Sequence, residues 1–498
     1  MRAAFIAAEC EPWAKTGGLG DVVDALARSL GRVPGGPSVP VDVFLPRYRG
    51  GRVPQDAVVA APLAVPDPYA RGGQTEVRLL EARVRGYRLR LIDCPEAFDR
   101  DGFYGDADDG DYPDNAWRFG LLGRAALAAL RADAAAGGEP VDVLHLHDWH
   151  AGGVALLRDG DLAADPVVRR AAIVLTLHNL AFHGWTPRDR LGQLGLAPGD
   201  GLLPRDADGI DVLRAAIERA EIVNTVSPTY AAEALTETYG FGLQDALGAL
   251  GNRYLGILNG IDEEAWNPAD DCALPAHYDA RDPSGKARCR EALLAEVGLD
   301  PADPGPVLGH LGRIDRQKGV DLIADAVPEL VDAGARLVVL GVGDARLSTQ
   351  LAAAAATTGG AMVYVDRFDR DLARRIYAGC DLFLMPSRFE PSGLTQMIAM
   401  RYGTPPIARR TGGLADSIAD ETAHPGAGTG FLFEAATSEA LVAACWAALR
   451  VRGDGTSTAW ANLVSRAMAT HFGWEAEAAP RYLEAYRRAV DLRRAATG

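Results

Sequence analysis

The chain alternates short apolar segments with longer amphipathic ones. The short segments are rich in β-branched and aromatic residues and predict buried strands. Alanine- and leucine-rich stretches with helical spacing lie between them, among them 21–30, 319–330 and 371–380. This alternation is typical of βαβ units, so it predicts an α/β protein with parallel sheets and helices on both faces. The predicted strands are 3–9, 41–46, 87–94, 141–147, 172–178, 221–227, 307–313, 335–341, 362–367, 381–387 and 404–410.

The predicted strands fall into two groups, and each group predicts one Rossmann-like, doubly wound domain. A chain of 498 residues is too long for a single hydrophobic core. We place the boundary in the turn-rich, acidic segment GILNGIDEEAWNPADD, which gives domains 1–258 and 259–465. The remaining segment, 466–498, ends in an amphipathic helix. Residues 50–115 are rich in Gly, Pro and Asp and predict an insertion of loops and short strands.

Composition and charge exclude several classes of function. The net charge of −16 argues against nucleic acid or an anionic membrane as partner, because a basic footprint is missing. No apolar stretch is long enough to span a membrane, and 3–9 is interpreted as a first strand instead of a signal peptide. The six cysteines are scattered without metal-ligand spacing, which favours a reducing, cytoplasmic location. Oligomeric state stays open.

Lysine is rare in this chain. Of 51 basic residues only Lys15, Lys286 and Lys318 are lysines. Arginine and lysine differ in how they bind anions, so lysines kept in such a chain are candidates for sites that need a compact ammonium. For Lys286, in a polar segment, a plain surface position remains the alternative.

The first glycine-rich segment, KTGGLGD (15–21), follows a predicted strand and precedes a predicted helix. Gly17, Gly18 and Gly20 let the backbone approach a ligand closely, the helix start offers N–H groups, and Lys15 adds a charge. These features predict a phosphate or diphosphate site. The segment matches neither the Walker pattern nor the dinucleotide fingerprint.

The second half offers a complementary anion site. Arg313 ends a strand and Lys318 opens the next helix, so both cations belong at the carboxyl end of that strand. Glu390 stands before Pro391 and can accept sugar hydroxyls, while Ser392-Gly393-Leu394-Thr395 opens another helix. A second glycine turn, RTGGLAD (410–416), repeats the arrangement of 15–21, with an acid expected just before the helix.

The histidine-rich motif HLHDWH (145–150) has three possible roles. His145 and His147 share a strand face, which permits a zinc site, but no fourth ligand is apparent. A packed or hydrogen-bonded role and a role in lining a substrate site are the alternatives.

Several motifs together resemble the glycogen/starch synthase family, in particular its bacterial members. The resemblance runs from Met1 to the C-terminal helix and is carried by KTGGLGDVV (15–23), HLHDWHAGG (145–153), TLHNLAFHG (176–184), NTVSPTYAAE (224–233), ILNGID…WNP (257–268), GRIDRQKG (312–319), PSRFEPSGLTQ (386–396) and RRTGGLADS (409–417). It implies a GT-B glycosyltransferase fold, in which two domains face across a cleft and the last helix crosses back to the first domain.

The resemblance also implies the reaction: a retaining transfer of glucose from ADP-glucose to the non-reducing end of an α-1,4-glucan such as glycogen, without a metal or other cofactor. Because no pair of carboxylates stands out for a double displacement, a front-face transfer through an oxocarbenium-like state is the working hypothesis. The alternatives are UDP-glucose as donor, a short phosphorylated sugar as acceptor, and a non-catalytic glucan-binding protein.

Residue roles follow from the same resemblance. Catalytic roles are implied for His178, Arg313, Lys318, Glu390 and Asp148; donor or acceptor contacts are implied for Lys15, Gly17, Gly18, Asp21, Asn259, Arg313, Lys318, Phe368, Glu390, Ser392, Gly393, Leu394 and Thr395. Lys15, Arg313 and Lys318 would neutralise the diphosphate. Glu390 and His178 would hold hydroxyls of the transferred glucose.

Three positions depart from the pattern of relatives. Ser392 stands where the family commonly has cysteine, and Phe368 where bacterial members place a tyrosine under adenine. Ile398 replaces the second glutamate of many other retaining transferases, which argues against sucrose- and trehalose-type enzymes. An oxidoreductase is disfavoured by the missing dinucleotide fingerprint, and a phosphorylase by the lack of a suitable lysine. The acidic loop 100–115 is expected to be solvated.

Overall fold

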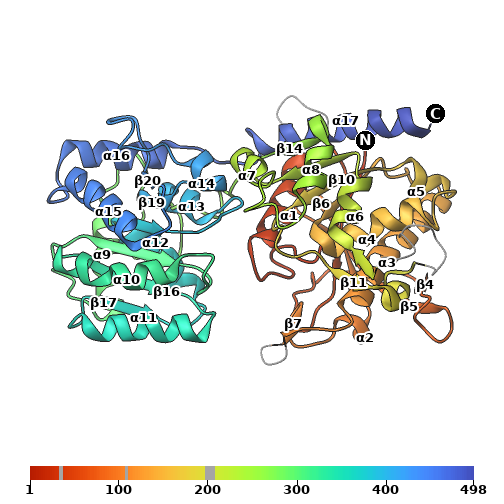
Figure 1. Cartoon of the computed structure of the whole chain (residues 1–498), viewed down its shortest axis with the longest axis horizontal. Coiled ribbons are helices and arrows are strands. Elements are labelled where there is room, and N and C mark those ends of the chain that lie inside the picture. Colours follow the sequence, from red (N-terminus) through yellow and green to blue (C-terminus); the bar gives the residue numbers. More distant parts are fainter. Residues whose placement is uncertain (33–37, 107–109, 197–207, 498) are drawn as a thin grey trace. The chain divides into compact units, whose positions relative to one another are not determined.

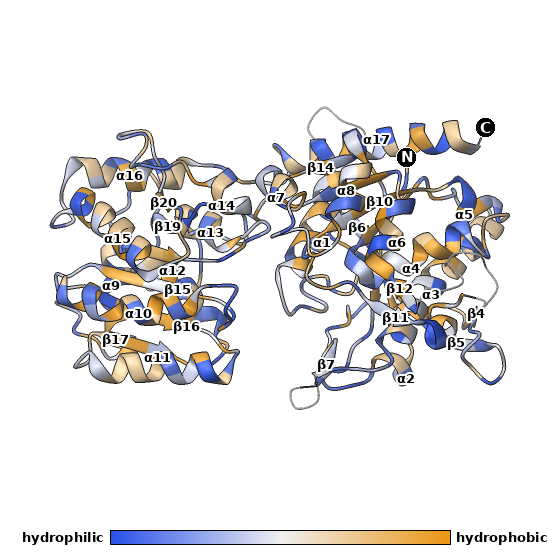
Figure 2. Cartoon of the chain, viewed as in Figure 1, coloured by the Kyte–Doolittle hydropathy of each residue, from blue (hydrophilic) through white to orange (hydrophobic). Residues whose placement is uncertain are grey.

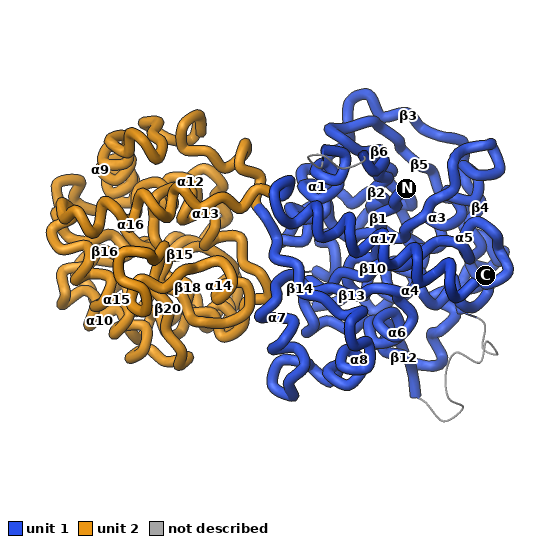
Figure 3. Tube along the Cα trace, turned by 90° about the horizontal axis from the view of Figure 1, so that it is seen from above, with its two compact units in different colours: residues 1–260, 474–498 blue, residues 261–473 orange. Residues whose placement is uncertain are grey.

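The computed structural model describes residues 1–32, 38–106, 110–196 and 208–497. The chain forms two compact units (Figure 3): unit 1 comprises 1–260 and 474–498, and unit 2 comprises 261–473. The first change of unit lies two residues from the predicted boundary at 258/259. The second lies later than predicted, because residues 466–469 still belong to helix α16 (Thr458–Ala469). Helix α17 (Ala478–Thr497) returns to unit 1 and packs on its sheet.

Unit 1 contains a sheet whose central strands are parallel and almost completely buried. Its order is β14 (Tyr254–Gly256), β13 (Ile222–Thr225), β10 (Ala172–Leu177), β9 (Val143–His147), β1 (Ala3–Ile6), β2 (Val41–Pro46), β6 (Tyr87–Asp93), β5 (Gln74–Val84) and β3 (Val58–Val59), with β4 (Leu63–Pro66) beside β5. Burial on both faces explains the continuous apolar runs of β1, β9 and β10.

The insertion predicted at 50–115 extends this sheet. Strands β3 and β4 pair antiparallel with β5, and residues 78–84 of β5 pair antiparallel with β6. Strands β7 (Gly105–Asp106) and β8 (Gly110–Asp111) form a small separate hairpin in the acidic loop. Residues 107–109 of that loop lie outside the described residues. The alternating sequence of β5 matches a strand with only one buried face.

Unit 2 contains an entirely parallel sheet (Figure 1). Its order is β17 (Met362–Val365), β16 (Arg336–Leu340), β15 (Val307–Leu311), β18 (Leu382–Met385), β19 (Pro406–Arg409) and β20 (Phe431–Phe433). All eleven predicted strands are thus present in the two sheets, most of them shorter than predicted. Figure 2 shows the hydrophobic strands between helices that carry polar residues on their outer faces.

Helices cover both sheets. In unit 1, α4 (Asp148–Asp159) packs against α3 (Asn115–Ala135) and α6 (Val212–Arg219), while α17 packs against β10 and α1 (Gly18–Leu30). In unit 2, α10 (Val320–Asp332) packs against α11 (Ala345–Thr357) and α15 (Ser438–Arg452), and α12 (Arg370–Gly379) packs against α9 (Gly285–Val297). None of the helices within the described ranges is long and apolar enough to cross a membrane.

Each sheet has one point where the strand order reverses. In unit 1 the chain winds outward from β1 in one direction and from β9 in the other; in unit 2 it does so from β15 and β18. Helices following such neighbouring strands leave to opposite faces, which opens a crevice at the strands' carboxyl ends where ligands of open α/β sheets bind. The two switch points therefore define where a site is expected in each unit.

Lys286 is not a surface lysine. Its Nζ turns inward from α9 and donates to Ala378 O at 2.9 Å, Tyr402 O at 3.0 Å and Thr404 Oγ1 at 2.7 Å. Burial lowers the pKa of its ammonium to about 8. The ammonium thus satisfies carbonyls near the C-terminal end of α12, where a positive charge is favourable.

We expect Lys286→Met to lower the free energy of unfolding by about 2 kcal/mol, because the carbonyls left behind lose their donor. The exposed Arg288 of the same helix supplies the control Arg288→Met, which should change stability by less than about 0.5 kcal/mol. Chemical denaturation monitored by circular dichroism measures both. Equal effects of the two variants would contradict the structural role of Lys286.

Candidate functional site

The glycine-rich loop of unit 1 follows β1 at the β1/β9 switch point. Gly17 is the N-cap of α1, and the helix begins at Gly18. Lys15 Nζ pairs with Asp21 Oδ1 at 2.6 Å, and Asp21 lies in the first turn of the helix, not before it as predicted. None of Gly17, Gly18 and Gly20 has a positive φ, so the expected tight turn does not depend on left-handed geometry.

A buried carboxylate that the sequence did not single out organises this loop. Glu9 accepts the N–H of Thr16 at 2.6 Å, the N–H of Gly17 at 3.0 Å and the hydroxyl of Tyr104 at 2.6 Å. The N–H of the N-cap Gly17 is therefore bonded to Glu9 in this structure. Glu9 is the last residue of the predicted strand 3–9, whereas β1 ends at Ile6, and nothing else in the sequence marks it.

Asp148 and His178 meet at the same edge of the sheet. Asp148 Oδ1 accepts the backbone N–H of His178 at 2.7 Å, which ties the end of β10 to the start of α4. Asp148 adopts a φ of +55°, rare for a residue with a side chain. Burial raises the pKa of its carboxyl to about 7, although the hydrogen bonds that it accepts from backbone N–H groups lower the pKa. Burial also lowers the pKa of His178 to about 3, so the ring is neutral.

Two predicted contact residues are buried with a polar atom unused. Asn259 in unit 1 and Ser392 in unit 2 are each 5% exposed, and neither Asn259 Oδ1 nor Ser392 Oγ has a hydrogen-bond partner within the described residues. A buried polar atom without a partner destabilises the fold, so such atoms are candidates for ligand contacts.

In unit 2 an ion pair spans the β15/β18 switch point. Lys318 Nζ donates to Glu390 Oε2 at 2.7 Å, and the Ser387 hydroxyl donates to the same oxygen at 3.0 Å. Glu390 is 5% exposed, so these donors replace the hydrogen bonds to water that its carboxylate loses on burial. The pairing of Lys318 with Glu390 and the contribution of Ser387 were not predicted, because they link separate loops.

Arg313 is at the same edge but does not contact Lys318. Its guanidinium pairs with Asp315 at 3.1 Å, and its side chain is 59% exposed. The other oxygen of Asp315 accepts the Lys318 N–H at 2.9 Å, so this carboxylate orders the whole turn. Phe368, expected under adenine, is 78% exposed in the loop before α12.

Close backbone contacts fix the turn that carries Glu390. Gly393 has a φ of +67°, Leu394 is the N-cap of α13 (Thr395–Arg401), and the Thr395 hydroxyl contacts Met385 Sδ at 3.5 Å. A Cβ on Gly412 would lie 2.0 Å from Glu390 O, and one on Gly413 would lie 1.9 Å from Ser392 O. The second glycine turn thus supports the Glu390 turn, and its helix α14 begins at Gly412, before the acid predicted to precede it.

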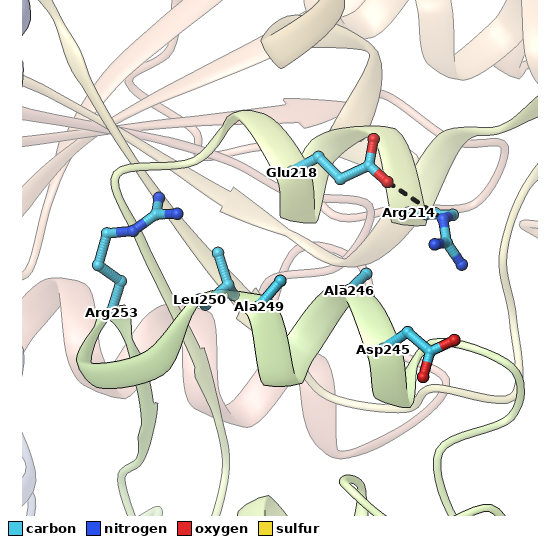
Figure 4. Close-up of a pocket in the computed structure, with 7 residues that line it drawn as sticks. All are labelled: Arg214, Glu218, Asp245, Ala246, Ala249, Leu250 and Arg253. Atoms are coloured by element: carbon cyan, nitrogen blue, oxygen red, sulfur yellow. Dashed lines mark hydrogen bonds and ion pairs between the residues drawn. The ribbon is translucent and has the colours of Figure 1, made fainter.

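Two further features belong to other parts of the chain. A pocket with a volume of about 230 Å³ lies between α6 and α8 (Gln244–Ala249). Figure 4 shows the residues that line it: Arg214, Glu218, Asp245, Ala246, Ala249, Leu250 and Arg253. None of the predicted site residues lines it. Across the described ranges, no group of three or more His, Cys, Asp or Glu side chains is arranged to hold a metal ion.

The raised pKa of Asp148 makes stability depend on pH. The folded protein keeps this carboxyl protonated up to about pH 7, whereas the unfolded chain releases the proton near pH ~4. Between these values the folded state holds the extra proton, so stability falls as pH rises. Asp148→Asn keeps an acceptor oxygen and removes this effect. We expect the difference between the Tm of Asp148→Asn and the Tm of wild type to increase by a few degrees, in favour of the variant, between pH 5 and pH 8. A difference that does not change with pH would argue against a buried, protonated Asp148.

The contact at Gly413 predicts a second effect on stability. Gly413→Ala should cost about 2–3 kcal/mol, because the Glu390 turn must move away from the new methyl group. Gly426→Ala is the control: Gly426 has a φ of +82° but open space around its Cβ position, so only the backbone strain of about 1 kcal/mol remains. Denaturant titrations compare the two, and a milder effect at Gly413 than at Gly426 would count against the tight contact.

Comparisons with known proteins agree with these observations. Residues 2–249 match the model of the starch synthase catalytic domain, and residues 305–450 match that of glycosyl transferases group 1. The glycogen synthase of Aromatoleum aromaticum is 42% identical over 98% of this chain and 96% of its own length. That of Roseobacter denitrificans is 39% identical over 98% and 99%.

A solved structure is similar over almost the whole chain. The catalytic domain of starch synthase IV from Arabidopsis thaliana, bound to ADP and acarbose, has a TM-score of 0.87 and 34% identity and covers 98% of this chain and 99% of its own. The GT-B fold and its two Rossmann-like domains are thereby confirmed. On these sequence and structural matches, the chain is a member of the glycogen and starch synthase family of glycosyltransferases.

Proposed function

We propose that this enzyme elongates an α-1,4-glucan by transferring glucose from ADP-glucose to the non-reducing end, with retention of configuration and without a metal. The observation that carries the proposal is the Lys318–Glu390 pair at the β15/β18 switch point. Glu390 offers a carboxylate for glucose hydroxyls, and Lys318 offers an ammonium for phosphate oxygens. The relatives named glycogen synthase, and the solved starch synthase bound to ADP, support this choice.

Cations supply most of the catalysis in this scheme. Breaking the bond between glucose and phosphate builds negative charge on the leaving ADP, and preorganised positive groups stabilise that charge. Lys318 is already held in place by Glu390 and Asp315. The exposed Arg313 has room to reorient from Asp315 onto a phosphate, and Lys15 is the candidate cation of unit 1.

The glucan and the donor would meet polar and aromatic groups in the loops that follow the strands of both sheets. Asn259 Oδ1 can accept a hydroxyl, and Ser392 Oγ can donate to a phosphate or accept a hydroxyl. Gly393, Leu394 and Thr395 would offer backbone N–H groups to the distal phosphate at the start of α13. Phe368 would stack on the nucleotide base, a contact that adenine and uracil can both make.

The donor and metal requirements are tested together. Incorporation of labelled glucose into glycogen is compared for ADP-glucose and UDP-glucose at equal concentration in the presence of EDTA. We expect incorporation chiefly from ADP-glucose. Preference for UDP-glucose would overturn the donor assignment, dependence on added metal would overturn the metal-free mechanism, and binding of glucan without transfer from either donor would favour the non-catalytic alternative. Transfer to glucose 1-phosphate but not to glycogen would show that the acceptor is a short phosphorylated sugar.

Lys318→Ala should lower kcat at least about 100-fold while the protein remains folded, because one cation at the leaving group is lost. Arg316→Ala is the matched control, since Arg316 is an exposed arginine of the same loop with no role in this scheme. It should stay within about twofold of wild type. Steady-state rates and thermal melts of both variants check this, and near-normal turnover of Lys318→Ala would remove the lysine from the mechanism.

The cysteines fit a cytoplasmic enzyme, which is part of the proposal. All six are free thiols, and five of them are buried. Unpaired cysteines are typical of a reducing compartment.

A further inference from the structure

The histidine motif at the end of β9 makes two sets of buried hydrogen bonds, one through His145 and one between His147 and His178. The rings of His145 and His147 lie 4.2 Å apart, and His147 Nδ1 is 3.0 Å from His178 Nε2. Burial lowers the pKa of all three imidazoles, so each is neutral and carries one ring hydrogen. Which nitrogen carries it follows from the neighbours.

The hydrogen of His145 is assigned by a buried network. Asn224 Nδ2 donates to Thr225 O at 3.3 Å, so its Oδ1 is the acceptor for the Thr176 hydroxyl at 2.9 Å. Thr176 Oγ1 has no second hydrogen and must accept from His145 Nε2 at 2.7 Å. His145 Nδ1 is then bare and accepts the hydroxyl of Tyr486 in α17, also at 2.7 Å. Both nitrogens of His145 are therefore occupied.

The contact between His147 and His178 has two possible directions. His147 Nε2 is buried and has no hydrogen-bond partner in the described part of the chain. If His178 Nε2–H were the donor, His147 would carry its hydrogen on this buried Nε2 without an acceptor. If His147 Nδ1–H is the donor instead, the buried His147 Nε2 carries no hydrogen and only its lone pair lacks a partner. A buried N–H without an acceptor is the rarer and costlier defect, so His147 Nδ1–H is the donor.

We infer that His147 is a positioning residue that donates Nδ1–H to His178 Nε2 and so leaves His178 with Nδ1–H as its one hydrogen-bond donor. The backbone of His178 is held at the same time by Asp148 at 2.7 Å. With Nε2 occupied and Nδ1 protonated, His178 has no lone pair available to accept a proton.

The role that this tautomer gives His178 toward a substrate rests on the proposed function. His178 would donate a hydrogen bond to a hydroxyl oxygen of the transferred glucose, and it would not act as a general base. Such a role agrees with a front-face transfer, in which the acceptor's proton leaves with the departing phosphate. The His178 ring must then be in its Nδ1–H tautomer before the substrate binds, and the hydrogen bond from His147 holds it in that tautomer.

The test is a ¹⁵N NMR measurement on the full chain labelled at histidine. Two-bond ¹H–¹⁵N correlations distinguish a protonated from a bare ring nitrogen, and the nine histidines keep the spectrum simple. Comparison with His178→Gln assigns the His178 signals. We expect a protonated Nδ1 and a bare Nε2 on His178 in the wild type. A protonated Nε2 would overturn the inference, whether or not the protein transfers glucose.

Two variants separate the hydrogen bond from packing. His147→Leu removes the donor, so His178 should shift to the Nε2–H tautomer and kcat should fall about tenfold. His147→Asn can place an amide N–H near the former Nδ1, so it should keep the wild-type tautomer and lie within about threefold of wild-type kcat, although both variants lose core contacts. If His178 keeps its tautomer in His147→Leu, or if the asparagine variant behaves like the leucine variant, His147 does not set the tautomer.

Discussion

The ion pair between Lys318 and Glu390 is the interaction on which the site in unit 2 depends. It joins the turns that follow β15 and β18, the two strands that flank the switch point. A carboxylate that is 5% exposed needs strong donors, and it has them in Lys318 and Ser387. The turn beneath it is packed so closely on Gly412 and Gly413 that a methyl group at either position would collide with its backbone. The pair and the close packing of this turn together fix the position of the Glu390 side chain.

Unit 1 uses a comparable arrangement at its own switch point. There Glu9 is the buried carboxylate, and its donors are the backbone of Thr16 and Gly17 and the hydroxyl of Tyr104. Each unit thus places a glycine turn, a helix start and a buried acid at the carboxyl ends of its central strands. The resemblance between 15–21 and 410–416 is one sign of this arrangement, although the two helices begin at different glycines.

The fold could be predicted well from the sequence because buried parallel strands leave continuous apolar runs. All eleven predicted strands formed, and the chain order of the motifs brought Lys318 and Glu390 to one edge of a sheet. Side-chain partners were harder to predict. Glu9 gave no periodic signal, Lys286 stood in a polar segment yet points inward, and the contacts of His147 depend on strands that are distant in sequence. Such pairings are set by tertiary packing, which a single sequence does not display.

The central claim is that these two switch-point sites serve a retaining glucosyl transfer from ADP-glucose. Time-resolved NMR of a reaction with a maltooligosaccharide acceptor, ADP-glucose and EDTA tests it most directly, because it follows the linkage and the leaving group together. The account predicts new α-1,4-linked glucose at the non-reducing end from the first turnovers, with one ADP released for each glucose added. A β-linked first product, or release of ADP with free glucose and no chain growth, would contradict it.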